Sequence, residues 1–250
     1  FSRYGTFDLL REENKKLVKD LIGEVASEHC VPDDKNGSLV AGLVGDFYRE
    51  GMDTAKINEA GITPLLSELN GIEKIRSTGE LQQEMIRLYT QGYPALFFLY
   101  PSPDRDHSDM VIANFHQGGM GLHDVDYYRN DDARSREIRE RYTSYMEQMF
   151  RLAGMEDNEV RKAAGNVMQM ETRLAHAAMT RLEQRDPHLT FNIFSPEELE
   201  DLSPHFPWLA FMHAMGVDPG NRINVGQPGF LREVSSMLGD PPMESWKHFL

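Results

Sequence analysis

The sequence lacks the features that would reveal a compartment or a covalent framework. It has one cysteine, Cys30, among 250 residues, so no disulfide within the chain can hold the fold. Its longest apolar run, residues 95–100, is far shorter than the roughly 20 residues that cross a bilayer. No signal peptide is visible, and because the sequence opens on Phe1 rather than Met, we expect residues upstream. The compartment stays open between the cytoplasm, a bacterial cell envelope and the extracellular space.

Positive charge is also scarce. The chain carries 26 Lys and Arg against 40 Asp and Glu, a formal net charge of -14. This balance argues against binding to nucleic acid, which needs clustered cations, and against an anionic membrane surface as partner. The hydrophobic content of 40% is enough for a sizeable core. The composition therefore fits an acidic globular protein.

Catalytic motifs are absent as well. The helical zinc motif His-Glu-x-x-His places two imidazoles beside a general base, but none of the nine histidines is followed by Glu. No G-x-S-x-G elbow or P-loop occurs. Cys30 follows His29, yet adjacent side chains on a helix do not face each other. We therefore predict no catalytic residue and no metal ligand within this chain.

Helical patterns fill most of the sequence. Apolar residues recur at helical spacing after Thr6, after Ser38 and after Thr78. Thr63-Pro64 and Ser195-Pro196 each place proline at the first helical position. Residues 134–185 predict two helices that are broken near Gly154, with Asp157 or Asn158 opening the second. We expect a mainly α fold, a multi-helical lobe.

One segment predicts strands instead. Residues 95–100 and 110–115 are apolar and flank a polar stretch, which predicts a β-hairpin with a long loop. The acidic loop Asp104-Arg105-Asp106 lacks the ligand spacing and closing Glu of a calcium-binding EF-hand. Residues 118–121 (Gly-Gly-Met-Gly) lack the Lys of a phosphate-binding loop, so we interpret them as a turn where backbone passes closely.

Several segments resemble the neprilysin (M13) family of zinc endopeptidases, in that family's N-terminal order. The markers are Ser2-Arg3-Tyr4-Gly5-Thr6-Phe7-Asp8-Leu9-Leu10-Arg11, Phe47 to Asp53 with Ile57 and Gly61 to Leu65, His116 to Tyr128, Glu171 to Ala175, Arg185-Asp186-Pro187, Phe191-Asn192, Phe206-Pro207-Trp208 and Glu244-Ser245-Trp246. The third is the most specific and is similar to Gln-x-x-x-Gly-Leu-Pro-x-Arg-Asp-Tyr-Tyr. The chain departs from it at His123, where the family usually has Pro, and at Val125, where it usually has Arg.

The resemblance implies a fold and a function. Residues 1–250 would form the N-terminal helical lobe of a zinc metalloendopeptidase that hydrolyses peptides, and this lobe would help to enclose the substrate cavity. The zinc ion and its ligands would belong to a C-terminal catalytic region beyond residue 250, so this chain alone would bind no zinc and be inactive. Gly51 stands where animal members carry a cysteine, which favours a bacterial-type member. The expected partners are peptide substrates and the catalytic region of the same protein.

The resemblance also implies a substrate-binding role for the first marker. Its two arginines, Arg3 and Arg11, correspond to positions associated with the C-terminal carboxylate of the peptide, and Phe7 and Asp8 would help to shape the same subsite. Arginine is always charged and presents a planar fork that suits carboxylates. Arg11, Lys15 and Lys19 lie four residues apart, a row of like charges that an anionic partner would relieve.

A different class of function stays open. The chain could be a stand-alone helical binding module, a degenerate relative that keeps the lobe without a protease. The coding sequence after Leu250 separates the two, because a His-Glu-x-x-His motif there supports the peptidase and a stop codon supports the module.

Overall fold

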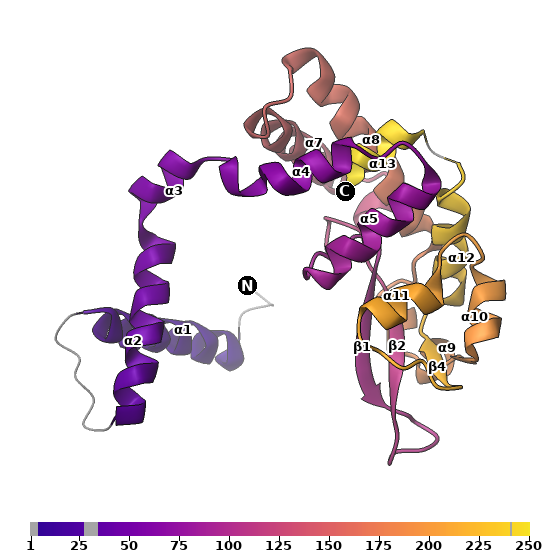
Figure 1. Ribbon diagram of the computed structural model, residues 1–250, viewed down its shortest axis with the longest axis horizontal. Coiled ribbons are helices and arrows are strands. Elements are labelled where there is room, and N and C mark those ends of the chain that lie inside the picture. The colour runs from indigo at the N-terminus through magenta and orange to yellow at the C-terminus, as the bar shows by residue number, and fades with distance from the viewer. Residues whose placement is uncertain (1–4, 28–34, 241) are drawn as a thin grey trace. The chain divides into compact units, whose positions relative to one another are not determined.

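A computed structural model describes residues 5–27, 35–240 and 242–250. The chain divides into two compact units, residues 1–64 and 65–250 (Figure 1). Helices dominate both units, and strands are confined to the second, as far as the structure describes the chain. The prediction of a mainly α fold with a small β element is confirmed.

The first unit is built on a pair of long helices. Helices α1 (Thr6–Ala26) and α2 (Lys35–Met52) pack against each other, and the short α3 (Thr54–Ala60) follows. Gly45 of α2 is buried at their contact, where an added Cβ would lie 3.0 Å from the carbonyl oxygen of Val25. Arg49 donates a 2.7 Å hydrogen bond to the carbonyl of Ala26, the last residue of α1. A small residue and a capping arginine thus fix where the two helices meet.

The second unit holds the remaining elements. They are the end of a 3-10 turn η1 (Thr63–Leu65), α4 (Leu66–Glu73), α5 (Thr78–Thr90), β1 (Phe97–Pro103), β2 (Val111–Gln117), α6 (Asp126–Arg129), α7 (Ala133–Leu152), α8 (Asp157–Ala177), η2 (Glu183–Arg185), α9 (Pro187–Thr190), β3 (Ile193–Phe194), α10 (Pro196–Leu202), α11 (Trp208–Ala214), β4 (Ile223–Val225), α12 (Pro228–Met237) and α13 (Met243–Phe249). In Figure 1, β1 and β2 form the long hairpin, and α10, α11 and α12 lie beside it.

Most predicted helix starts fall within a few residues of the observed ones. Ser195 caps α10 by accepting from the amide of Glu198, and Asp157 opens α8. Gly154, where we expected a break, has a φ of 90° between α7 and α8. The prediction that an α-helix begins with Pro64 was wrong, because Thr63 and Pro64 form a 3-10 turn and α4 begins at Leu66. Helix α2 begins at Lys35, before the predicted Ser38.

The predicted hairpin is confirmed and belongs to a larger sheet. Strands β1 and β2 pair antiparallel with Phe97 opposite Gln117. Strand β4 lies parallel to β2, and β3 completes the order β1-β2-β4-β3. Strands β3 and β4 span only two and three residues, too few for an alternating pattern to be recognised in the sequence.

Strand β1 forms one edge of this sheet. The hydroxyl of Tyr89 donates to the carbonyl of Phe97 at 2.8 Å and accepts from the Phe97 amide at 2.8 Å, so the backbone of Phe97 faces away from β2. Alternate residues of a strand share that direction, which places Leu99, Pro101 and Pro103 on the same outer edge. Two of these four positions are prolines and carry no N–H.

The core of the second unit is centred on aromatic rings. Trp208 of α11 is fully buried, and its ring centroid lies 5.0 Å from those of Phe97 and Phe115 and 4.7 Å from that of Phe206. The indole Nε1 of Trp208 donates to the carbonyl of Ser203 at 2.9 Å. The Phe206-Pro207-Trp208 marker therefore joins α11 to both strands of the hairpin.

The acidic hairpin loop has a structural partner. The buried carboxylate of Asp104 forms an ion pair with Arg222 at 2.5 Å, and Asp106 lies 3.1 Å from the same guanidinium. The hydrogen bond from Arg222 lowers the pKa of Asp104 to about 2. These carboxylates tie the loop to the segment before β4 through Arg222.

The glycine-rich segment after β2 is a close backbone turn, as its sequence predicted. Gly119 has a φ of 69°, and a Cβ at this position would lie 2.7 Å from the carbonyl oxygen of Ala95. Such a contact is too short for any side chain, and the left-handed conformation itself favours glycine. The turn brings Gly121 and Leu122 against α8.

A buried carboxylate on α8 fastens this turn. Glu171 accepts hydrogen bonds from the hydroxyls of Tyr128 at 2.7 Å and Tyr142 at 2.8 Å and from the amide of Gly121 at 3.2 Å. The Tyr128 hydroxyl in turn accepts from the amide of Leu122 at 2.8 Å. Burial raises the pKa of Glu171 above its ordinary value. The marker that ends at Tyr128 and the marker that begins at Glu171 thus belong to one hydrogen-bonded cluster.

Candidate functional site

The predicted substrate-binding residues lie at the beginning of α1. Gly5 precedes the helix in an extended conformation, and the carboxylate of Asp8 accepts from its amide at 2.9 Å. A helix cap at Thr6, the interpretation that its hydroxyl and the apolar spacing after it suggest, is wrong by one residue, because Thr6 is the first helical residue and Gly5 occupies the capping position. An acidic side chain in the first turn also interacts favourably with the helix dipole.

The four predicted residues have different outcomes. Arg3 lies outside the described residues. The side chain of Phe7 is 84% exposed. Arg11 forms an ion pair with Asp8 at 3.5 Å, and its side chain is 67% exposed. Phe7 and Arg11 line a common groove, whereas Asp8 contacts that groove only through its ion pair with Arg11.

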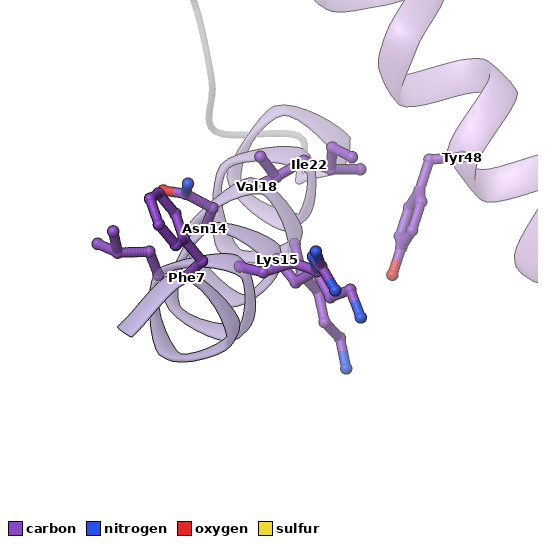
Figure 2. Close-up of a pocket in the computed structure, with 9 residues that line it drawn as sticks. Phe7, Asn14, Lys15, Val18, Ile22 and Tyr48 are labelled. Carbon is purple, nitrogen blue, oxygen red and sulfur yellow. The ribbon is translucent and has the colours of Figure 1, made fainter. Parts of the chain in front are cut away.

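This groove runs along one face of α1 and is bounded by α2. It is open to solvent and has a volume of about 750 Å³. Figure 2 shows Tyr48 of α2 standing across from α1, with its hydroxyl end on the side towards which Lys15 extends. The residues that line the groove are Phe7, Leu10, Arg11, Asn14, Lys15, Val18, Lys19, Ile22 and Tyr48. We refer to it as the α1 groove.

The charge of the α1 groove is opposite to that of the chain. Among the described residues, its lining contains three cations, Arg11, Lys15 and Lys19, and no carboxylate, in a chain whose net charge is -14. Arg11 is paired with Asp8, and Lys15 lies 3.1 Å from Glu12. Lys19 forms no ion pair with any residue that the structure describes. The groove therefore suits an anionic ligand.

The apolar part of the lining gives the groove a second property. Leu10, Val18 and Ile22 follow one side of α1, and the aromatic rings of Phe7 and Tyr48 add flat surfaces. The aliphatic stems of lysine and arginine also cover apolar surface while their charged ends stay in water. A ligand that combines carboxylates with apolar groups would complement this surface.

The described residues that line the α1 groove include no carboxylate, histidine, cysteine or serine. Across the described parts of the chain, no three His, Cys, Asp or Glu side chains are grouped so that they could hold a metal ion. No described helix is long and apolar enough to cross a membrane.

Two of the residues named from the sequence line this groove. Phe7 and Arg11 come from the first marker, and the spacing of Arg11, Lys15 and Lys19 indicated a row of cations on one helical face. Tyr48 belongs to the second marker, but its position across from α1 depends on how α1 and α2 pack, which the sequence does not show.

Comparison with known proteins identifies relatives along the whole chain. The model of "Peptidase family M13" matches residues 1–250. Endothelin-converting enzyme 1 of Rattus norvegicus is 27% identical over 248 residues, which cover 95% of this chain and 31% of that enzyme. The human enzyme is 26% identical over 248 residues. The chain thus spans about a third of the length of these curated relatives.

Two solved structures have the same fold. The Mycobacterium tuberculosis zinc metalloprotease Zmp1, in complex with an inhibitor, is 26% identical and superposes with a TM-score of 0.83, covering 98% of this chain and 37% of Zmp1. PepO of Lactobacillus rhamnosis HN001 gives a TM-score of 0.76 at 16% identity, with 94% of this chain and 37% of PepO covered. The second similarity concerns the fold alone.

Proposed function

This chain belongs to peptidase family M13, and we propose from this membership that it is the helical, non-catalytic part of a zinc metalloendopeptidase that hydrolyses peptides. The observation that carries the proposal is the match of one family model to residues 1–250, together with solved relatives that are zinc metalloproteases. Within the whole protein, this part would help to enclose the substrate cavity, while a C-terminal catalytic region would supply the zinc ion, its ligands and the general base.

The α1 groove would take part in substrate binding. Arg11 presents a guanidinium at the groove lining, and Asp8 holds it near the first turn of the helix. We propose that Arg11, with Arg3, receives the C-terminal carboxylate of the peptide, and that Phe7 and Asp8 shape this subsite. The charge of the groove and its apolar lining support this assignment.

We expect the full-length protein to contain one zinc ion and to hydrolyse short peptides, and the 250-residue chain to do neither. Tight zinc binding requires several converging ligands, and no such group is present among the described residues. Elemental analysis and cleavage of a quenched fluorescent peptide measure the two properties. Chelation should abolish cleavage by the full-length protein, and added zinc should restore it.

Two outcomes would contradict the proposed function. A full-length protein without zinc and without peptidase activity would support the stand-alone binding module instead. Stoichiometric zinc in the purified 250-residue chain that survives mild chelation would show that a metal site had been missed.

The first unit also exposes an unusual amount of apolar surface. Helix α1 contains no buried residue, and Leu17 is 57% exposed. Leu39 and Leu43 on α2 are 65% and 63% exposed, and Phe47 is 82% exposed. Soluble proteins rarely leave such faces uncovered. We propose that the C-terminal region of the same protein packs on them.

We therefore expect the isolated 250-residue chain to self-associate or to bind a hydrophobic dye strongly. The full-length protein should do neither, since its C-terminal region would cover these helices. Sedimentation velocity and dye fluorescence on both proteins test this expectation. A monodisperse 250-residue monomer with no dye binding at high concentration would contradict the packing proposal.

A further inference from the structure

The two lysines of the α1 groove have no role in the subsite proposed for Arg11. Lys15 and Lys19 follow Arg11 by four and eight residues, so they lie about 6 and 12 Å further along the helix axis. Both line the groove, and the lysine next to them, Lys16, does not. The row of cations thus continues along the groove past the carboxylate subsite proposed at Arg11. This indicates that the groove contacts a longer stretch of the ligand than its C-terminus.

We propose that Lys15 and Lys19 form a specificity subsite for acidic side chains, so that the enzyme prefers peptides with two carboxylates spaced two residues apart. The inference rests on the proposed peptidase function. Residues i and i+2 of an extended peptide point to the same face and lie about 6.7 Å apart. This separation matches the rise of about 6 Å between Lys15 and Lys19.

Charge and packing both favour an acidic peptide as the occupant. As far as the structure describes it, the lining has three cations and no carboxylate, and Lys19 has no ion-pair partner in the same part of the chain. Lys15 is paired only with the exposed Glu12, and an exposed pair of this kind contributes little stability, so a ligand carboxylate can replace it. Val18 and Ile22, on the same lining, would contact apolar groups of the peptide.

The test uses the full-length protein and three matched peptides. The peptides share one sequence and differ at two positions, i and i+2, which carry Glu, Gln or Lys. The variants are Lys15→Glu, Lys19→Glu and the double variant, and Lys16→Glu is the control because it makes the same charge change outside the groove lining. The readout is the ratio of kcat/KM for the Glu peptide to kcat/KM for the Gln peptide.

We expect the unmodified protein to favour the Glu peptide by about 10-fold at low salt and less at high salt. Each single substitution should lower the ratio about 5-fold, and the double variant should prefer the Lys peptide. Lys16→Glu should leave the ratio within about 2-fold. The Lys16→Glu variant should cleave the Gln peptide at the native rate, which shows that a charge reversal on α1 outside the groove lining leaves the peptidase intact.

Equal cleavage of the Glu and Gln peptides by the unmodified protein would overturn the inference and leave the peptidase function standing. An equal effect of Lys16→Glu would also overturn it, because the preference would then come from overall charge. If no peptide is cleaved, the proposed function fails, and anisotropy of the three labelled peptides decides whether the subsite exists. Binding of phosphatidylserine vesicles that depends on Lys15 and Lys19, without discrimination among peptides, would assign the groove to a membrane surface instead.

Discussion

Replacing Glu171 with alanine is expected to lower the free energy of unfolding by about 3–5 kcal/mol. The substitution removes the acceptor of the Tyr128 hydroxyl, the Tyr142 hydroxyl and the Gly121 amide. An unsatisfied buried donor costs about 1–3 kcal/mol, and the turn at residues 118–122 loses its attachment to α8. Urea unfolding measures the loss, and hydrogen exchange at the amides of Gly121 and Leu122 shows whether this turn opens first.

Two further variants make the Glu171 prediction specific. Gln169→Ala changes an exposed residue of the same helix and should shift stability by no more than about 0.5 kcal/mol. Glu171→Gln keeps the shape but donates where the carboxylate accepts, so it should fall between alanine and the native residue. Equal stability of the native protein and Glu171→Ala would contradict the proposed role of the cluster.

The difference in stability between the native protein and Glu171→Gln is also expected to depend on pH. Because burial raises the pKa of Glu171 in the folded protein, the folded state binds the proton more tightly than the unfolded state does. The stabilisation from this proton is complete below the ordinary carboxyl pKa and is lost as pH rises through the folded pKa. The native protein should therefore be most stable relative to Glu171→Gln in acid, and the difference should shrink towards neutral pH.

Replacing Arg11 with methionine in the full-length protein is expected to reduce kcat/KM selectively for peptides with a free C-terminus. A charge-assisted contact that is partly desolvated by the peptide corresponds to about 1.5–3 kcal/mol, or roughly 10- to 150-fold. The matching amidated peptide lacks the carboxylate and should be affected much less. Most of the change should appear as a raised KM, since the carboxylate contact would be equally strong in the bound substrate and in the transition state.

The conservative variant separates charge from geometry at this position. Arg11→Lys keeps the charge but not the planar fork. It should therefore retain part of the discrimination between free and amidated peptides that Arg11→Met loses. Arg3→Met should act in the same direction if both arginines receive the carboxylate. Identical kinetics for the two peptides in the native protein and in both methionine variants would end this assignment.

The sequence predicted the parts of the fold that depend on local signals. The hairpin of β1 and β2 follows from two apolar runs around a polar loop, and the break at Gly154 follows from one glycine between helical patterns. Strands β3 and β4 could not be predicted, because each is short and exists only through its pairing with a strand distant in the sequence. The ion pair between Asp104 and Arg222 could not be predicted either, because the two residues are 118 positions apart in the sequence.

The candidate site was predictable to a similar extent. A helical period was enough to place Arg11, Lys15 and Lys19 on one face. The position of Tyr48 depends on the close approach of α1 and α2 at Gly45, which no local pattern records. Glu171 was part of a family marker, but its hydrogen bonds could not be predicted, because a single sequence does not show which face of α8 is buried.

The edge of β1 has a consequence for how the protein behaves at high concentration. Exposed strand edges recruit strands from other molecules through unpaired N–H and C=O groups. Here Tyr89 occupies the backbone groups of Phe97, and Pro101 and Pro103 provide no donor. A neighbouring molecule could form a regular ladder with this edge only around Leu99, which is too short to propagate. The hairpin is thereby protected against the intermolecular β-pairing that starts amyloid-like aggregation.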